Sequence, residues 1–294
     1  MVTVIILTYN ASQRFSGLLD SLETQTLKPA QIIIIDSESS DKTAELAESR
    51  NCKVIRIQKN KFDHGTTRNL AAQNIESEFM VFLTQDAIPT DEHMINELIK
   101  PMQADPNIAV CYGRQIPRHN ARQLERFARE FNYPEQSILK TKNDIETLGL
   151  KTFFCSNVCS AVRRSIFNKL GGFKDKVIVN EDMLFAAKAI TQGYSVYYNA
   201  KAKVYHSHPF SLIQTLRRYF NIGRFFAENR SILKQAELKS YTSDMLKTGV
   251  KKFWKQHSPH HIAALLLEFT IKAIAFKLGF YYQLLFHRKQ RNGT

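Results

Sequence analysis

Residues 1–10 read MVTVIILTYN and residues 31–36 read QIIIID, and each apolar run is closed by polar residues. Neither run alternates apolar with polar side chains, which is typical of strands that are buried on both faces of a sheet. Similar runs recur at Lys53–Ile57, Glu78–Leu83 and Ile108–Gly113. Segments with helical spacing separate these runs, so the sequence predicts an α/β fold in which helices cover a mostly parallel sheet.

Helices are predicted between these strands, and one more helix and strand follow in the second half of the chain. The helices span Ser12–Glu23, Asp41–Ser49, Thr66–Gln73, Asp91–Lys100 and Glu181–Thr191, and the strand spans Ser195–Tyr205. Asp41 and Asn180 are placed to cap the second and the fifth of these helices, although turn chemistry alone also accounts for Asp41. Because ligands bind beyond the carboxyl ends of parallel strands, the residues after each strand are the first candidates for a site.

A nucleotide site is predicted where the first two strands end. Thr8, Tyr9 and Asn10 follow the first strand, and Asp36 and Glu38 follow the second. An aromatic face and a carboxylate at one sheet edge can hold a nucleobase by stacking and by accepting a ring N–H. The chain contains neither GxGxxG nor GxxxxGK[ST], which excludes a dinucleotide fingerprint and a P-loop.

Charged residues near the same edge suggest a site for a diphosphate and a metal ion. Asp86 follows the fourth strand, where a carboxylate suits a divalent cation held against a diphosphate. Arg68 would add positive charge to that diphosphate. His206, just past the last strand, is a candidate second metal ligand. The alternatives are that Asp86 only forms a turn, that Arg68 is a surface arginine and that His206 packs against its neighbours without binding a metal.

Two adjacent acids, Glu181 and Asp182, precede a long apolar helix. Acids in a first turn suit the helix dipole, so helix initiation is one interpretation. Neighbouring side chains on a helix point about 100° apart, so one acid can face a pocket while the other braces the backbone. The second interpretation is therefore a catalytic base at this helix start.

The order and spacing of these motifs over residues 2–225 resemble the inverting glycosyltransferases of family 2, which have the GT-A fold and use nucleotide-diphosphate sugars. The phrases FDHG at 62–65, LTQDA at 83–87 and HSH at 206–208 look most like the bacterial rhamnosyltransferase branch. This resemblance implies transfer of L-rhamnose from dTDP-L-rhamnose to a lipid-linked polysaccharide. A UDP-hexose or UDP-N-acetylhexosamine donor remains an alternative.

The resemblance also implies a role for each candidate residue. The nucleotide would be bound by Thr8, Tyr9, Asn10, Asp36, Glu38, Arg68 and Gln85; a divalent cation, Mg²⁺ or Mn²⁺, by Asp86 and His206; the acceptor by Phe154, Asn157, Glu181, Arg217 and Arg218; and Asp182 would be the general base. The family has two or three acids near the metal, whereas Gln85 and Ala87 flank a single Asp86 here. A weak metal site is expected, in which the diphosphate provides most ligands.

The last third of the chain has a different composition. Residues 201–294 contain 17 Lys and Arg against 4 Asp and Glu, whereas residues 1–200 contain 24 against 23. Aromatic and aliphatic residues alternate with arginines after residue 209, which predicts a basic amphipathic helix at a membrane interface or packed on the catalytic domain. The apolar stretch 262–286 carries Glu268, Lys272 and Lys277, so an in-plane or oligomer-packing helix is expected rather than a membrane span.

We therefore expect a GT-A catalytic domain at residues 1–208, with a nucleotide-binding part at 1–113 and an acceptor-binding part at 114–208. Residues 209–294 would form a basic helical region that associates with a membrane or with a second copy of the chain. Four unpaired cysteines and the absence of a charged leader suggest a cytoplasmic protein on the inner face of the cytoplasmic membrane.

Two other classes of protein compete with a transferase. The basic tail is compatible with a nucleic-acid-binding protein, but its aromatics lie among long aliphatic stretches and no nucleic-acid motif is present, so no nucleic-acid partner is expected. The sparse acidic motif at Asp86 is compatible with a non-catalytic glycan-binding module. At 294 residues and 44% hydrophobic composition, the chain is neither disordered nor fibrous.

Overall fold

One sheet of nine strands organises the part of the chain that the computed structural model describes, residues 1–73, 75–207, 210–234 and 239–291. The strands are β1 (Val2–Thr8), β2 (Gln31–Asp36), β3 (Lys53–Arg56), β4 (Phe79–Thr84), β5 (Ile88–Pro89), β6 (Ile108–Ile116), β7 (Ile138–Lys140), β8 (Cys159–Arg163) and β9 (Ser195–Tyr205). Their order is β3-β2-β1-β4-β8-β6-β9-β5, with β7 paired to β9. Strands β1 to β4 are parallel, as are β6 and β9, and β8 joins these groups by antiparallel pairing.

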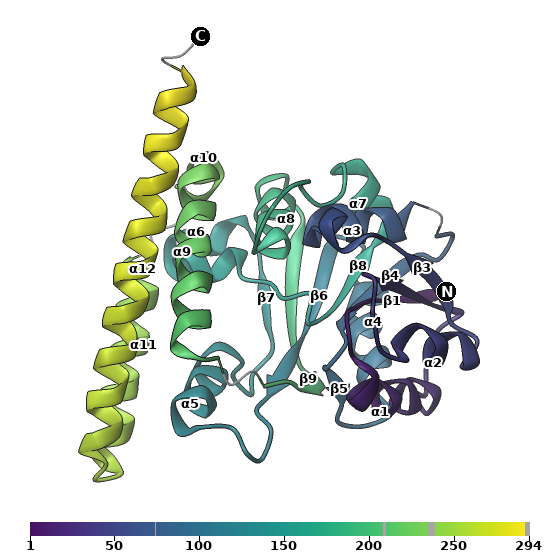
Figure 1. The fold of residues 1–294 in the computed structure, drawn as a ribbon, viewed down its shortest axis with the longest axis horizontal. Helices are drawn as coiled ribbons and strands as arrows, with labels where there is room; N and C mark the ends of the chain where they lie inside the picture. Colours follow the sequence, from purple (N-terminus) through teal and green to yellow (C-terminus); the bar gives the residue numbers. More distant parts are fainter. Residues whose placement is uncertain (74, 208–209, 235–238, 292–294) are drawn as a thin grey trace.

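Helices connect and cover these strands (Figure 1). They are α1 (Ser12–Glu23), α2 (Thr43–Ser49), α3 (His64–Ala72), α4 (Met94–Ala104), α5 (Gln123–Asn132), α6 (Ile145–Leu148), α7 (Arg164–Lys169), α8 (Glu181–Thr191), α9 (Leu212–Glu228), α10 (Arg230–Leu233), α11 (Lys239–Lys255) and α12 (Pro259–Arg291). Single 3₁₀ turns occur at η1 (Lys59–Lys61), η2 (Lys142–Asp144) and η3 (Gly149–Phe153).

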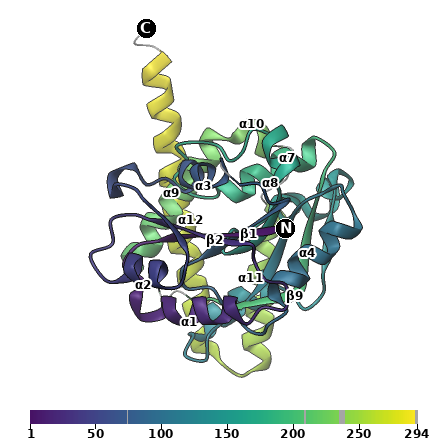
Figure 2. The same cartoon turned by 90° about the vertical axis from the view of Figure 1, so that its right-hand side faces the viewer.

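Both faces of the sheet are covered, as Figure 2 shows with the strands in the middle. Val4 and Ile6 pack with α1, α2 and α4 on one face, whereas Ile5 packs with α3, α7 and α8 on the other. Successive side chains of a strand point to opposite faces, so both sets must be apolar here. This packing explains the unbroken apolar runs and confirms the predicted α/β sheet.

Most predicted elements match the structure, and the differences have local causes. The strand predicted at Ser195–Tyr205 has those bounds, whereas β5 and β7 have two and three residues and are too short to show a period. The predicted side-chain cap at Asn180 is wrong, because this residue has a φ of 62° and its side chain makes no capping hydrogen bond. Asp41 does accept the backbone N–H of Thr43 at the start of α2.

The helices after residue 209 pack on the sheet domain and on one another. Phe225 and Phe226 of α9 belong to the same apolar core as β1 and α8. Gly223 on α9 and Gly279 on α12 lie where the two helices touch, because a Cβ atom on either would overlap a backbone carbonyl of the other helix. Within the described ranges no helix is both long and apolar enough to span a membrane. The boundary near residue 208 stays a prediction.

Candidate active site

A pocket of about 950 Å³ opens where β1 and β4 end, and we call it the sheet-edge pocket. Its lining includes six residues predicted to bind donor or metal, namely Thr8, Tyr9, Asn10, Arg68, Gln85 and Asp86. It also includes Arg14, Lys59 and His64, which the sequence did not single out. The predicted edge of the sheet is therefore concave and carries several cationic side chains.

Asp36 organises the loop after β2. It is buried, and its carboxylate accepts hydrogen bonds from Oγ1 of Thr8 at 3.0 Å and from the backbone N–H and hydroxyl of Ser39 at 2.9 and 2.5 Å. Ser39 in turn accepts the backbone N–H of Asn10 at 2.9 Å. These bonds tie the ends of β1 and β2 together, while the role of Asp36 toward a nucleobase stays a prediction.

Tyr9 stands at the mouth of this pocket with its side chain exposed. Its backbone N–H donates to Oε1 of Gln85 at 2.8 Å, and Nε2 of Gln85 donates to the Tyr9 carbonyl at 3.1 Å. Lys59 on η1 lies with Nζ 4.2 Å from the centre of the Tyr9 ring and donates to its hydroxyl at 2.7 Å. Glu38 accepts the backbone N–H of Lys59 at 2.9 Å. Gln85 and Glu38 therefore hold Tyr9 and Lys59 in place.

Three buried polar atoms on the lining of the sheet-edge pocket have no hydrogen-bond partner among the described residues. They are Oγ of Ser37, Nε of Arg68 and Oγ1 of Thr84. A buried polar atom without a partner is destabilising by about 1–3 kcal/mol, so such atoms are rare in native proteins. Each of these atoms exposes almost no surface to the cavity, so the residues line the sheet-edge pocket while these particular atoms lie behind its wall.

Arg68 and Glu181 form a buried ion pair between α3 and the start of α8. Nη1 of Arg68 lies 2.9 Å from Oε1 of Glu181, and both side chains are at most 6% exposed. Burial raises the pKa of Glu181, but the charges of Arg68 and His64 outweigh burial and lower that pKa below its ordinary value. Arg68 is therefore not the surface arginine that was one interpretation of the sequence.

Asp182 has a different environment from its neighbour. Its carboxylate accepts the backbone N–H of Asn157 at 3.0 Å and its own helix's Met183 N–H at 2.7 Å. Burial, and next the charge of Glu181, raise the pKa of Asp182 to about 7. A carboxylate with a pKa near neutral is suited to accept a proton at physiological pH. Of the two acids, Asp182 therefore has the pKa expected of a general base.

Asn157 links the two acids. Its side-chain Nδ2 donates to Oε1 of Glu181 at 3.2 Å, and its side-chain Oδ1 accepts the hydroxyl of Ser160 at 2.8 Å. The residue is buried. Phe154, three residues earlier, packs edge-on against Tyr112 with ring centres 5.9 Å apart. The structure thus shows Asn157 positioning the acids, and a direct contact of Asn157 or Phe154 with an acceptor stays a prediction.

Asp86 and His206 lie together, with Oδ1 of Asp86 3.6 Å from Nε2 of His206. Nδ1 of His206 lies 2.8 Å from Oε1 of Gln115, and Nη1 of Arg129 donates to the same oxygen. Nη2 of Arg129 also lies 3.2 Å from Nδ1, so this nitrogen contacts both an acceptor and a donor, while Nε2 faces the Asp86 carboxylate. His208 lies outside the described residues. Across the described ranges no cluster of three or more His, Cys, Asp or Glu side chains could hold a metal.

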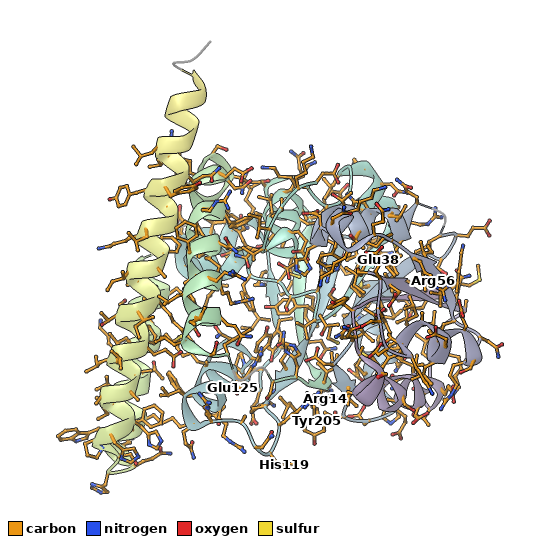
Figure 3. All side chains as sticks on the ribbon, in the orientation of Figure 1. Arg14, Glu38, Arg56, His119, Glu125 and Tyr205 are labelled. Carbon is orange, nitrogen blue, oxygen red and sulfur yellow. The ribbon has the colours of Figure 1, made fainter. Side chains whose placement is uncertain are left out.

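Arg118 is a further site residue that sequence reasoning missed. Nη2 of Arg118 donates to the backbone carbonyl of Asp86 at 2.7 Å. Burial lowers the pKa of Arg118, and the nearby charge of Arg14 lowers it further. Figure 3 labels Arg14 on the lower side of the sheet domain. Arg118 comes two residues after β6, but that strand was predicted to end at Gly113, and Arg14 lies inside α1, so neither arginine stood at a predicted strand end.

Two comparisons place the sequence among known proteins. A family profile described as "Glycosyl transferase family 2" matches residues 3–171. The O-antigen chain rhamnosyltransferase WbaN of Salmonella anatum is 40% identical over 285 residues, which is 96% of this chain and 90% of that protein. RfbN of Salmonella typhimurium, described in the same words, is 40% identical over 97% of this chain and 91% of its own length. Both findings confirm the resemblance to the rhamnosyltransferase branch.

Solved structures show a similar fold. The mannosyltransferase PcManGT from Pyrobaculum calidifontis, in complex with GDP-Man and Mn²⁺, has a TM-score of 0.66 at 16% identity, covering 96% of this chain and 86% of its own. Residues 1–349 of Staphylococcus aureus TarS with UDP-GlcNAc have a TM-score of 0.58 at 18% identity, covering 91% of this chain and 72% of that one. These likenesses confirm the GT-A-like fold.

Proposed function

Because the chain belongs to glycosyl transferase family 2, we propose that it transfers L-rhamnose from dTDP-L-rhamnose to a lipid-linked polysaccharide with inversion at the anomeric carbon. The two relatives that share 40% of its residues carry the name of O-antigen chain rhamnosyltransferases, which supports this donor sugar and this class of acceptor. A UDP-sugar donor is the alternative, since TarS was solved with UDP-GlcNAc.

The observation that carries the donor site is the sheet-edge pocket itself, whose lining brings Ser37, Arg68 and Thr84 together with the predicted residues Thr8 and Tyr9. A nucleotide diphosphate brings acceptor oxygens for Arg68 and both donors and acceptors for the two hydroxyls. The Tyr9 ring, once Lys59 moves from its face, offers a surface on which a base can stack. Asn10 and Asp36 lie at the same edge and complete the proposed nucleotide site.

Asp182 is proposed to accept the proton of the attacking hydroxyl. As the proton leaves, the acceptor oxygen forms a bond to the anomeric carbon from the face opposite the diphosphate, and the bond to the diphosphate oxygen breaks. Arg68 offsets charge that grows on the leaving group. Glu181 remains ionised and holds Arg68 in place, and Asn157 aims Asp182 through its backbone N–H.

Asp86 and His206 fit a divalent cation, because a carboxylate oxygen and an imidazole nitrogen, both of which are common metal ligands, lie 3.6 Å apart. Gln115 would fix the imidazole from behind, as the outer partners of metal-bound histidines commonly do. A bound Mg²⁺ or Mn²⁺ would neutralise charge on the diphosphate. With two protein ligands, affinity without donor should be weak.

The acceptor is proposed to contact the residues predicted to bind it, of which Glu181 begins α8, Arg217 and Arg218 lie on α9, and Phe154 and Asn157 lie between η3 and β8. We also propose that the protein works on the inner face of the cytoplasmic membrane. The support is a row of exposed apolar side chains on α12 within the basic last third of the chain, since helices of this composition bind anionic membranes. A second copy of the chain is the alternative partner for this face.

The test is nucleotide diphosphate release with membrane-extracted lipid acceptor, from dTDP-L-rhamnose, GDP-mannose and UDP-N-acetylglucosamine in turn. We expect release from dTDP-L-rhamnose only, loss in EDTA with recovery on adding Mg²⁺ or Mn²⁺, and loss in Asp182→Asn. Release from a UDP-sugar alone would reject the proposed donor but retain the reaction class. Release from dTDP-L-rhamnose that EDTA leaves unchanged would reject the metal.

A further inference from the structure

A second cavity, of about 480 Å³, lies between α5, α9 and α12, and we call it the helical pocket. Its lining includes the side chains of Arg122, Arg129, Tyr219 and Lys272. Figure 3 labels Glu125 of α5 at this position, between the sheet and the C-terminal helices. Of the residues given a role above, only Arg218 lines this pocket, so the proposed reaction does not yet explain it.

The charge of the helical pocket is positive. Lys272 pairs with Glu268, which also lines the pocket, so these two charges offset each other. Three arginines then remain against one carboxylate, that of Glu125. The guanidinium of Arg122 is exposed and has no hydrogen bond or ion pair within the described part of the chain. Guanidinium groups at a concave surface bind phosphate in a bidentate manner, so the pocket suits a phosphate or a diphosphate.

One contact and one electrostatic effect connect the helical pocket to the proposed reaction site. Arg129 lies with Nη2 3.2 Å from Nδ1 of His206, the proposed metal ligand. His64 lines the sheet-edge pocket, and burial is the main cause that lowers its pKa. The charge of Arg218, which lines the helical pocket, lowers the pKa of His64 further. An anion in the helical pocket would therefore lie beside Arg129, which contacts the proposed metal ligand His206.

Apolar side chains border the helical pocket where α9 begins. Phe210 lines the pocket, and the guanidinium carbon of Arg218 lies 5.6 Å from the centre of its ring. Three further apolar side chains on the first turns of this helix are exposed, namely Leu212, Ile213 and Leu216. A hydrocarbon chain attached to the phosphate could continue along this surface and remove it from water.

We propose that the helical pocket binds the phosphate ester through which the acceptor glycan is attached to its apolar carrier, with Arg122 and Arg218 as the principal phosphate contacts. This inference rests on the proposed function for the identity of the acceptor. The pocket would hold the lipid end of the acceptor while the sugar end reaches Asp182. It would thereby select lipid-linked over free glycans.

The test measures binding of farnesyl diphosphate by calorimetry, with saturating dTDP to fill the sheet-edge pocket. We expect binding in the presence of dTDP, weakened at least about tenfold in the Arg122→Gln/Arg218→Gln variant, because each lost charged contact is worth about 1.4 kcal/mol or more. Arg230→Gln, which removes an exposed arginine outside both pockets, should bind as the wild type does. Arg122→Gln alone should give an intermediate loss and serves if the double variant does not fold.

Displacement of farnesyl diphosphate by dTDP, or equal binding by the double variant, would overturn the proposal. Inorganic pyrophosphate that binds as tightly as farnesyl diphosphate would overturn the part of the proposal that concerns the apolar chain. The measurement needs no turnover, so it separates this inference from the proposed function. Binding that follows these expectations in a protein that transfers no rhamnose would support the phosphate site while rejecting the donor assignment.

Discussion

At the scale of single residues, Glu181 and Asp182 are adjacent acids with opposite pKa shifts. Arg68 and His64 keep Glu181 ionised, and that charge together with burial raises the pKa of Asp182 to about 7. Such divergence between neighbouring carboxyl groups supports different roles for them. Glu181 holds Arg68, and Asp182 is the acid that we propose exchanges a proton.

The first prediction concerns the pH dependence of transfer. Asp182 must be deprotonated to accept a proton, so kcat/KM should rise with pH through an apparent pKa of about 7. Glu181→Gln removes a charge that raises this pKa and should move the rising limb to lower pH. Glu48→Gln, at an exposed pair with Arg56, should leave the limb in place. A limb near pH 4 in the wild type would contradict the role of Asp182.

The second prediction concerns stability. Arg68→Met leaves the buried charge of Glu181 unpaired and should lower the free energy of unfolding by about 3–5 kcal/mol. Adding Glu181→Gln should recover part of this loss, because the unpaired charge is then gone. Arg56→Met breaks an exposed pair with Glu48 and should change the free energy by less than about 1 kcal/mol. Urea unfolding measures all three, and equal losses for Arg68→Met and Arg56→Met would reject a special role for the buried pair.

At the scale of elements, the crossing of α9 and α12 depends on glycine. Gly223→Ala would place a methyl group against the carbonyl of Phe276 and should lower the free energy of unfolding by about 1–3 kcal/mol. Gly17 lies inside α1 with no atom within 4 Å of an added Cβ, so Gly17→Ala should raise stability by about 0.5–1 kcal/mol. Thermal unfolding distinguishes the two. A Gly223→Ala variant as stable as the wild type would show that the helices do not pack this closely.

The elements that could be predicted from sequence are those with a strong local signal. β1 and β2 are apolar on both faces, and α8 begins at two acids and continues as an apolar run. β8 was not predicted, because it reads CSAVR and mixes small and charged residues; its place between β4 and β6 comes from long-range pairing. Local patterns carry no information on such pairing.

The same distinction holds for the site. Thr8 and Asp86 follow strands directly, so their place at one edge could be predicted from strand order. Lys59 and Arg118 reach the site from a 3₁₀ turn and from a loop after β6, at positions that only the folded chain defines. The partnership of Arg68 with Glu181 joins residues 113 positions apart, and no spacing rule predicts it.

At the scale of the whole molecule, α12 presents a long face away from the sheet domain (Figure 1). Exposed apolar side chains recur along it at Leu267, Ile274, Leu278, Tyr281 and Leu285. These positions share one side of a helix, because their spacings of 7, 4, 3 and 4 follow the helical period. A contiguous apolar face of this kind requires a partner in water.

The prediction at this scale is salt-sensitive binding to vesicles. The protein should sediment with vesicles of phosphatidylcholine and phosphatidylglycerol, and less with phosphatidylcholine alone, because the last third of the chain is basic. Leu267→Ser/Leu278→Ser should weaken binding by about tenfold or more, since two large side chains leave the lipid. Leu70→Ser, at an exposed leucine of α3, is the matched control. Wild-type protein that forms a dimer and does not sediment with vesicles would indicate that a second copy of the chain, rather than a membrane, covers this face.

The most direct test of the proposed reaction is the anomeric configuration of the transferred sugar. Rhamnose moved from dTDP-L-rhamnose in a single displacement, with Asp182 as the base, must have the configuration opposite to that of the donor. NMR of the product of the wild-type protein reports this through the anomeric carbon–hydrogen coupling. We expect inversion in the wild type and no product from Asp182→Asn. Retained configuration, or product from Asp182→Asn at the wild-type rate, would contradict the proposed mechanism.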